Sequence, residues 1–324
     1  MAYFAEDYRY EQMSDTQENQ FVILAMYHFV RLDDIEEIKP PLLELCVESD
    51  LIGTILLAQE GLNGTVAGPR AGIDKLLSHL QSDPRFDGLT HKFSYTDNPP
   101  FKRMKVKLKR EIVSMGIPDT DPNAICGERV DARRWNELLK DPEVLTIDTR
   151  NAYEVDIGTF ENAISPGTET FRDFPDYVDA NLDPAKHPKV AMFCTGGIRC
   201  EKATNYLKKR GFKDVFHLDG GILKYLETVE PDESLWQGEC FVFDDRVAVD
   251  ENLARGSYTQ CSACRRPLSD EDRASAQFEE GVSCPHCFGT KSKKKIEGLK
   301  QRQRQYELAE ERAAKALVGA EEPE

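Results

Sequence analysis

Residues 190–202 (VAMFCTGGIRCEK) constrain the fold of this chain more strongly than any other segment. An apolar run typical of a buried strand ends at Cys194, two glycines follow in the turn, and a helical pattern then begins. Short apolar strands that alternate with helices indicate a parallel sheet covered on both faces. The alternation continues on either side, with strands expected at residues 144–147, 190–193 and 215–217 and helices at residues 201–210 and 221–229.

The same segment has the composition of a thiolate site. Glycines in the turn let backbone N–H groups point inward, and the start of a helix adds positive potential. Arg199 places a cation five positions after Cys194. Because these features lower a thiol pKa and stabilise an anion at sulfur, we predict that Cys194 is a catalytic nucleophile and Arg199 its cation. The remaining residues of the predicted active-site loop are Thr195, Gly196, Gly197, Ile198 and Cys200.

The loop length favours a small group on the sulfur. Four residues separate Cys194 from Arg199, one fewer than in a cysteine phosphatase loop, which makes room for a phosphate. A buried structural cysteine beside a tight turn would need neither the glycine pair nor the arginine. Two interpretations of Cys200 stay open: it resolves an oxidised Cys194, or it is a small residue that packs the first helical turn.

The first third of the chain predicts a separate domain. Its order of strand, helix, strand, strand, helix, strand is the ferredoxin-like α+β pattern. We expect a flexible arm at residues 1–20, this domain at residues 21–115, and a linker rich in Gly, Pro and Asp at residues 116–128. Two details are a helix at residues 33–47, interrupted near Pro40 and Pro41, and a last strand at residues 104–113.

Two cysteine pairs near the C-terminus have the spacing of a metal site. They are Cys261 with Cys264 and Cys284 with Cys287, and nineteen residues separate the pairs. Paired thiolates on two turns can close a tetrahedron around zinc, and a site closed by four sulfurs is structural. The alternative is four reduced thiols at turns. The expected boundaries are residues 129–235 for the parallel α/β domain, 236–290 for the cysteine-rich zinc-binding region and 291–324 for a polar helical tail.

Charge restricts the partners of the chain. Lys and Arg total 42 against 58 Asp and Glu, and this net charge of −16 argues against a surface that coats nucleic acid or anionic membrane. One predicted strand nevertheless alternates cationic with apolar residues. Like charges on one face repel unless an anion uses them, so we predict phosphate binding there. The residues are Lys102, Arg103, Lys105, Lys107, Lys109 and Arg110; a second basic stretch, residues 291–304, is expected to be solvated surface.

Several other classes are disfavoured. No apolar run approaches the roughly 18 residues of a membrane span, and the first residues lack the pattern of a secretory signal. The nine cysteines are therefore expected to be reduced thiols in the cytoplasm, used for metal or catalysis. We find no flavin or dinucleotide fingerprint.

Residues 129–227 resemble a rhodanese domain. Residues 146–150 (TIDTR) match the Asp-x-Arg element of that family, residues 218–222 (LDGGI) match its closing Gly-Gly element, and the loop from Cys194 lies between them. The resemblance implies that Cys194 carries a persulfide, with Asp148 and Arg150 in supporting positions.

Three motifs narrow the resemblance. Residues 58–65 (AQEGLNGT), 194–202 (CTGGIRCEK) and 238–246 (GECFVFDDR) together resemble the rhodanese-domain tRNA uridine hydroxylases. This implies tRNA as the partner, molecular oxygen as a co-substrate, and hydroxylation of the wobble uridine at C5. Two alternatives are a plain persulfide sulfurtransferase and a non-catalytic RNA-binding module. The N-terminal domain and the basic strand argue against the first, and the intact loop from Cys194 to Arg199 argues against the second.

Overall fold

The computed structural model describes residues 20–118 and 120–318, and the backbone divides into two units, Met1–Cys126 and Gly127–Glu324. Of the arm predicted at residues 1–20, only Gln20 lies among the described residues.

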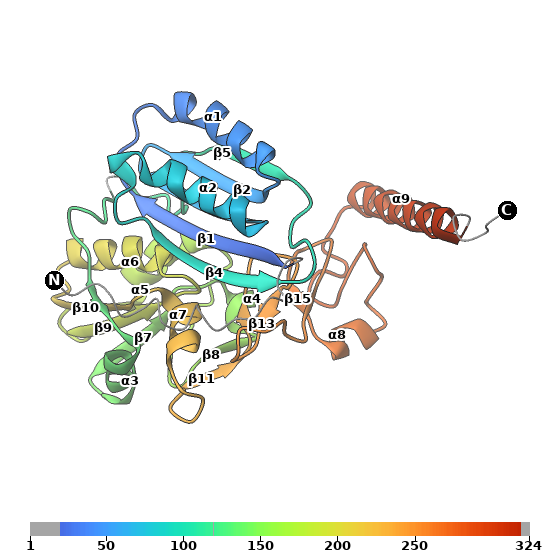
Figure 1. Cartoon of the computed structure of the whole chain (residues 1–324). Helices are drawn as coiled ribbons and strands as arrows, with labels where there is room; N and C mark the ends of the chain where they lie inside the picture. The colour runs from blue at the N-terminus through green and yellow to red at the C-terminus, as the bar shows by residue number, and fades with distance from the viewer. Residues whose placement is uncertain (1–19, 119, 319–324) are drawn as a thin grey trace. The chain divides into compact units, whose positions relative to one another are not determined.

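The first unit is built on a five-stranded sheet with the order β4-β1-β3-β2-β5. Strand β5 lies at one edge, parallel to β2, and the other neighbouring strands are antiparallel. Helices α1 and α2 cover one face of the sheet (Figure 1), where Leu24, Ile55 and Val106 are buried beneath them. This arrangement confirms the predicted α+β domain. The strands and α-helices are β1 (Phe21–Phe29), α1 (Ile35–Glu48), β2 (Ile52–Ala58), β3 (Gly61–Gly68), α2 (Arg70–Gln81), β4 (Thr90–Thr96) and β5 (Met104–Leu108).

Two local predictions for this unit are wrong. Helix α1 continues through its two prolines, because Leu42 and Cys46 are buried in the core and offset the missing N–H donors. Strand β5 ends at Leu108 instead of continuing to residue 113. The chain beyond it is held by side chains: the Ile112 N–H donates to the Glu60 carboxylate (2.6 Å), and the Ile112 carbonyl accepts from the Asn63 amide (2.8 Å).

The second unit contains a four-stranded sheet with the order β6-β10-β9-β7, in which all strands are parallel. This confirms the predicted parallel sheet. Because β7 and β9 are neighbours, their carboxyl ends bring Asp148 and Cys194 to the same edge, where α/β sheets bind ligands. The strands and α-helices are β6 (Glu128–Val130), α3 (Ala132–Lys140), β7 (Val144–Asp148), α4 (Ala152–Val155), β8 (Gly158–Phe160), α5 (Phe174–Asn181), β9 (Lys189–Phe193), α6 (Ile198–Lys209), β10 (Asp214–Leu218) and α7 (Gly221–Thr228).

The chain after α7 packs into the same core. Strand β11 pairs antiparallel with β8, and the ring of Trp236 lies 5.1 Å from that of Phe160. Phe160 also contacts Phe193 (4.9 Å) and Tyr225 (4.7 Å) edge to face. The last elements are β11 (Trp236–Gly238), β12 (Cys240–Phe241), β13 (Ala248–Val249), β14 (Thr259–Gln260), β15 (Pro267–Leu268), α8 (Asp270–Ala274) and α9 (Lys293–Val318).

Helix α9 confirms the predicted helical tail. Two contacts attach its first turns to the cysteine-rich region: Lys300 pairs with Glu279 (2.8 Å), and Arg302 donates to the Ser262 carbonyl (2.9 Å). Among the described helices, none combines the length and the apolar character that crossing a membrane requires.

Candidate active site and metal centre

Cys194 lies directly after β9, in the turn that leads into α6. Gly197 has a φ of 95°, a value that favours glycine, and its N–H donates to Cys194 Sγ at 3.1 Å. The start of α7 closes the loop, because the Ile222 N–H donates to the Cys194 carbonyl at 3.0 Å. A Cβ atom on Gly221 would lie 2.5 Å from that carbonyl oxygen, so the close approach requires glycine there.

The surroundings of Cys194 favour its thiolate. Burial alone would raise the pKa of this thiol. A hydrogen bond from Cys200, the charge of Arg199 and N–H groups in the first turn of α6 outweigh burial and lower the pKa to about 6. Because the side chain is 0% exposed, these groups rather than water stabilise the anion. The predicted nucleophile is therefore ionised at neutral pH.

Arg199 is fixed by a carboxylate that the sequence analysis missed. Its guanidinium donates two hydrogen bonds to Glu154, at 2.6 and 2.8 Å, and a third to the Thr195 hydroxyl at 3.3 Å. Burial would raise the pKa of Glu154, but Arg199 lowers it below its usual range, so the pair is ionised. The arrangement holds one face of the loop in a single geometry.

The sequence around Glu154 contains a recognisable pattern, but that pattern predicts a helix cap and not a partner for Arg199. Asn151-x-x-Glu154 has the spacing of a capping box, which accounts for the glutamate as a helix cap. In the structure Glu154 does both: it accepts the Asn151 N–H at 3.1 Å while it binds Arg199.

Asp148 and Arg150 form a brace beneath the loop. Both are 0% exposed, and Arg150 Nη2 lies 2.6 Å from Asp148 Oδ2. Arg150 also donates to the carbonyls of Gly158 (2.5 Å) and Glu154 (3.2 Å), and its guanidinium lies 5.1 Å from the Trp236 ring. The brace thus joins β7, α4 and β8, and it positions the carboxylate that holds Arg199.

Cys200 and Cys240 are neutral thiols near this site. Burial and the neighbouring Cys194 raise the pKa of Cys200 well above its usual range, so Cys200 stays protonated and donates to the Cys194 sulfur. Its own sulfur lies 3.6 Å from the Thr149 hydroxyl. Burial raises the pKa of Cys240 to about 12. Cys200 is therefore an electrostatic partner of Cys194 as well as a packing residue.

The predicted basic residues gather around the edge strand β5. Only Lys105 and Lys107 lie on the strand; Lys102 and Arg103 precede it, and Lys109 and Arg110 follow. Within the described part of the chain, no ion pair is formed by Arg103, Lys105, Lys107, Lys109 or Arg110. The charges are therefore clustered at one edge of the first unit, partly on strand and partly on flanking loop.

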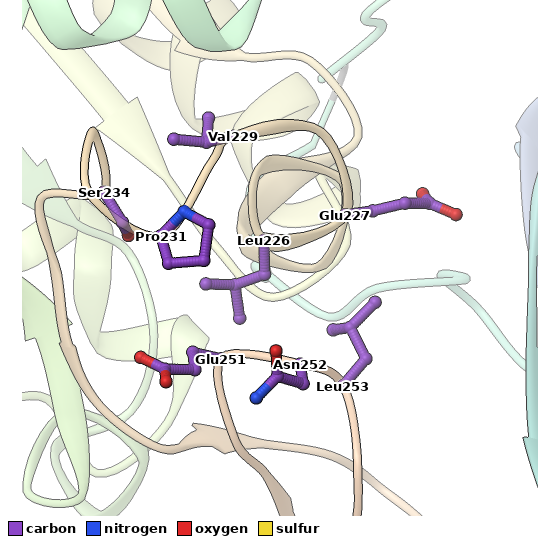
Figure 2. A pocket seen from close by; sticks show the side chains of 8 residues that line it. All are labelled: Leu226, Glu227, Val229, Pro231, Ser234, Glu251, Asn252 and Leu253. Carbon is purple, nitrogen blue, oxygen red and sulfur yellow. The ribbon is translucent and has the colours of Figure 1, made fainter.

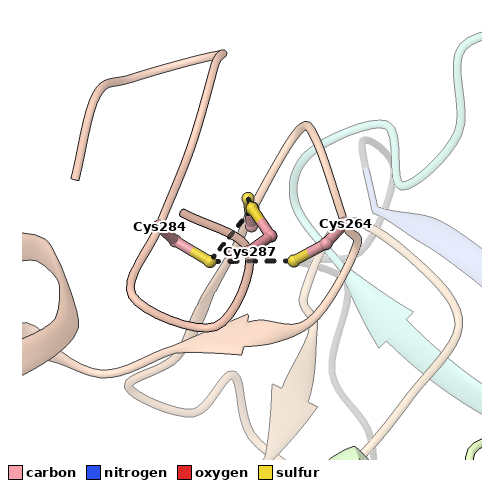
Figure 3. A group of neighbouring side chains, drawn as sticks. Cys264, Cys284 and Cys287 are labelled. Atoms are coloured by element: carbon pink, nitrogen blue, oxygen red, sulfur yellow. Dashed lines mark hydrogen bonds between the residues drawn. The ribbon is translucent and has the colours of Figure 1, made fainter. Parts of the chain in front are cut away.

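The four predicted metal ligands come together in the second unit. The sulfur of Cys264 lies 3.7 Å from that of Cys284, and the sulfurs of Cys284 and Cys287 are also 3.7 Å apart. Dashed lines in Figure 3 mark these two contacts. Cys261 completes the group, 4.0 Å from Cys287. A tetrahedron with metal–sulfur bonds of about 2.3 Å has sulfur–sulfur edges of about 3.8 Å. The four cysteines could therefore bind a metal such as zinc.

His286, which lies between the last two cysteines in sequence, is engaged elsewhere. Its Nε2 atom lies 3.2 Å from an Asp272 carboxylate oxygen. This agrees with a metal centre of four sulfurs.

A cavity of about 310 Å³ lies between the end of α7 and residues 251–253 (Figure 2). Leu226, Val229 and Leu253 give it an apolar lining, and Glu227 and Glu251 add carboxylates. Its lining includes no predicted site residue, no thiol and no cation, so we assign it no role in the chemistry of Cys194.

Comparison with known families matches both units. Residues 21–112 match the UPF0176 acylphosphatase-like domain, and residues 131–228 match the rhodanese-like domain. Similar solved structures include a rhodanese-like domain from Anabaena sp., 20% identical over 34% of this chain and 78% of that chain, with a TM-score of 0.29. A rhodanese-related protein from Thermoplasma volcanium is 22% identical over 32% and 95% of the two chains (TM-score 0.26). An acylphosphatase from Coxiella burnetii is 14% identical over 29% and 100% (TM-score 0.22).

Proposed function

We propose that this chain, which joins a UPF0176 acylphosphatase-like domain to a rhodanese-like domain, hydroxylates the wobble uridine of tRNA at C5 with molecular oxygen. A rhodanese-like domain suggests cysteine-based catalysis. The observation that carries the proposal is the Cys194 thiol, whose pKa is lowered to about 6 inside a loop of N–H donors. Three sequence motifs resemble those of tRNA uridine hydroxylases, and this resemblance is the reason for proposing uracil as the target of the thiol.

A thiolate is a suitable nucleophile for the uracil ring. Addition of Cys194 Sγ to C6 forms a carbon–sulfur bond and moves an electron pair to C5 and O4, so C5 becomes electron-rich. The Arg199 charge and the N–H groups at the start of α6 stabilise negative charge in this region. One atom of O₂ then enters the C5–OH bond and the other leaves as water, with two electrons and two protons supplied by a reductant. Loss of the C5 proton restores the C5–C6 double bond and breaks the C6–sulfur bond, which releases Cys194 as the thiolate.

The first unit supports an RNA substrate. A chain with a net charge of −16 repels tRNA at long range, so attraction requires a local positive field. The cations around β5 offer one, since Lys107, Lys109 and Arg110 are exposed and carry no competing carboxylate partner within the described residues. We assign these residues to phosphate binding.

The test is conversion of unmodified tRNA by purified protein under ¹⁸O₂ with a thiol reductant. We expect hydroxyuridine with one ¹⁸O atom by nucleoside mass spectrometry, and none from Cys194→Ser. The Glu137→Gln variant, changed at a solvent-exposed position of helix α3, serves as the control.

The same preparation tests the alternative function, which is persulfide sulfur transfer. The short loop between Cys194 and Arg199 also fits a persulfide, so we would measure sulfur transfer from thiosulfate to cyanide in parallel. Sulfur transfer without hydroxyuridine would replace our proposal by a sulfurtransferase. Hydroxyuridine from the Cys194→Ser variant would exclude thiol chemistry.

A further inference from the structure

The motif at residues 238–246 contributes no side chain to the chemistry proposed above, yet it places an exposed aromatic ring beside the active-site cation. Phe243 is 58% exposed. The centroid of its ring lies 5.9 Å from the guanidinium carbon of Arg199. A single exposed phenylalanine is ordinary on a protein surface. Phe243, in contrast, lies against the arginine of the thiolate loop, so its position beside the active site calls for an explanation.

Phe243 lies in the turn between β12 and β13, which is held by hydrogen bonds and a buried ion pair. The Val242 N–H donates to the Val247 carbonyl at 2.9 Å and closes the turn. Asp244 accepts from the backbone N–H of Arg246 at 3.0 Å and from its guanidinium at 2.7 and 2.9 Å, and both side chains are buried. A buried ion pair therefore fixes a turn whose aromatic residue remains in solvent.

Two further rings support the exposed one. Phe241 contacts Phe243 at 5.1 Å and 81°, and Tyr153 contacts Phe241 at 5.2 Å and 79°. Phe241 is buried, and Tyr153 follows the brace at Arg150 by three positions. The ring of Phe243 is thus connected by packing to the elements that hold Glu154 and Arg199, and its orientation relative to the loop is fixed.

We propose that Phe243 is a base-stacking residue, which binds an unpaired nucleobase of the RNA beside the Cys194 loop. This inference rests on the function proposed above and names the contact by which the substrate is held. Every nucleobase has a π face, and stacking on an aromatic side chain is the common way to bind unpaired bases. An enzyme that acts on a base must also hold that base or its neighbours outside the stack. The Arg199 guanidinium, 5.9 Å from the centroid of the Phe243 ring, helps to hold that ring beside the loop.

The first experiment is a binding cycle. Wild type and Phe243→Ala are titrated with a synthetic anticodon stem-loop that contains a wobble uridine, and with loops in which that nucleotide or either neighbour is abasic. The abasic loops keep every phosphate but lack one base. We expect Phe243→Ala to weaken binding of the intact loop roughly 5- to 150-fold. One of the abasic loops lacks the base that stacks on Phe243. We expect wild type and Phe243→Ala to bind that loop equally, because the stacking contact is absent from both complexes.

Phe288 offers a matched control, since it is an exposed phenylalanine (56%) outside the loop of Cys194. Phe288→Ala should bind the intact loop like wild type. Because both side chains are more than half exposed, we expect either substitution to lower the stability only slightly, and thermal unfolding of the two variants checks this.

A second variant reports on stacking itself. The two native tryptophans, Trp135 and Trp236, are buried (0% and 9% exposed), so Phe243→Trp adds the exposed indole. We expect its emission to be quenched by the intact stem-loop and not by the loop that lacks the partner base.

The outcomes separate this inference from the proposed function. One outcome is that Phe243→Trp emission is quenched and Phe243→Ala binds more weakly, while wild type forms no hydroxyuridine. That outcome would support the stacking contact and reject hydroxylation. Hydroxyuridine formation with Phe243→Ala binding every loop like Phe288→Ala would overturn the stacking contact alone. Equal losses with all abasic loops would also overturn it, because the residue would then affect binding without touching a base.

Discussion

Replacement of Glu154 by Gln should destabilise the second unit far more than replacement of an exposed carboxylate at the same distance from its arginine. Glu154 and Arg199 are 0% and 8% exposed in their side chains and 2.6 Å apart. Removing one partner of a buried pair leaves an uncompensated charge and costs about 3–5 kcal/mol. For a unit of this size, this corresponds to a loss of about 6–20 °C in its unfolding midpoint.

The control is Glu137→Gln. Glu137 also lies 2.6 Å from its partner, Arg134, but the two side chains are 53% and 52% exposed. Water already solvates this pair, so we expect a change within about 0.5 kcal/mol. Differential scanning calorimetry of both variants gives the comparison directly.

A double variant tests the mechanism. In Glu154→Gln with Arg199→Met neither buried charge remains, so the double variant should be more stable than the sum of the two single losses predicts. Additive losses, or a Glu154→Gln variant as stable as Glu137→Gln, would refute the role assigned to the ion pair.

Three further predictions concern other parts of the molecule. The difference in thiolate absorbance between wild type and Cys194→Ser should titrate near pH 6, with thiolate disappearing as the pH falls; Cys200→Ala should raise this midpoint and Cys200→Ser less so, because serine still donates a hydrogen bond. Elemental analysis of protein never exposed to chelator should find about one zinc per chain, and Cys264→Ser should lose it; no stoichiometric metal would contradict the centre. Changing Lys105, Lys107 and Lys109 together to Gln should weaken tRNA binding and flatten its dependence on salt, by a slope of roughly 0.7–0.9 for each phosphate that the variant no longer neutralises; an unchanged slope would make this edge ordinary solvated surface.

The parts of the molecule that the sequence predicted have local causes. Residues 190–202 encode a strand, a turn and a helix start within one short segment, and the position of Cys194 follows from that order. The four metal-ligand candidates were also recognisable, because the two Cys-x-x-Cys pairs each form a turn on their own. Neither inference required knowledge of what packs against the segment.

What sequence reasoning missed depends on interactions between distant residues. Glu154 is 45 residues from Arg199, and only the fold brings the two together. Strand β5 ends early because Glu60 and Asn63 capture the chain at Ile112, an interaction that no strand pattern contains. The exposure of Phe243 likewise could not be read from an apolar run that otherwise predicts burial.

The attachment of α9 has a mechanical consequence. At 1.5 Å per residue this helix of 26 residues is a rod of about 39 Å. Its contacts with the cysteine turns, through Lys300 and Arg302, lie in the first three turns. These two contacts attach the first turns of the helix to the region that carries the four cysteines. A small rotation of that region would move the far end of the helix through a much larger arc, so a metal ion bound by the four cysteines would also restrict the direction of the helix.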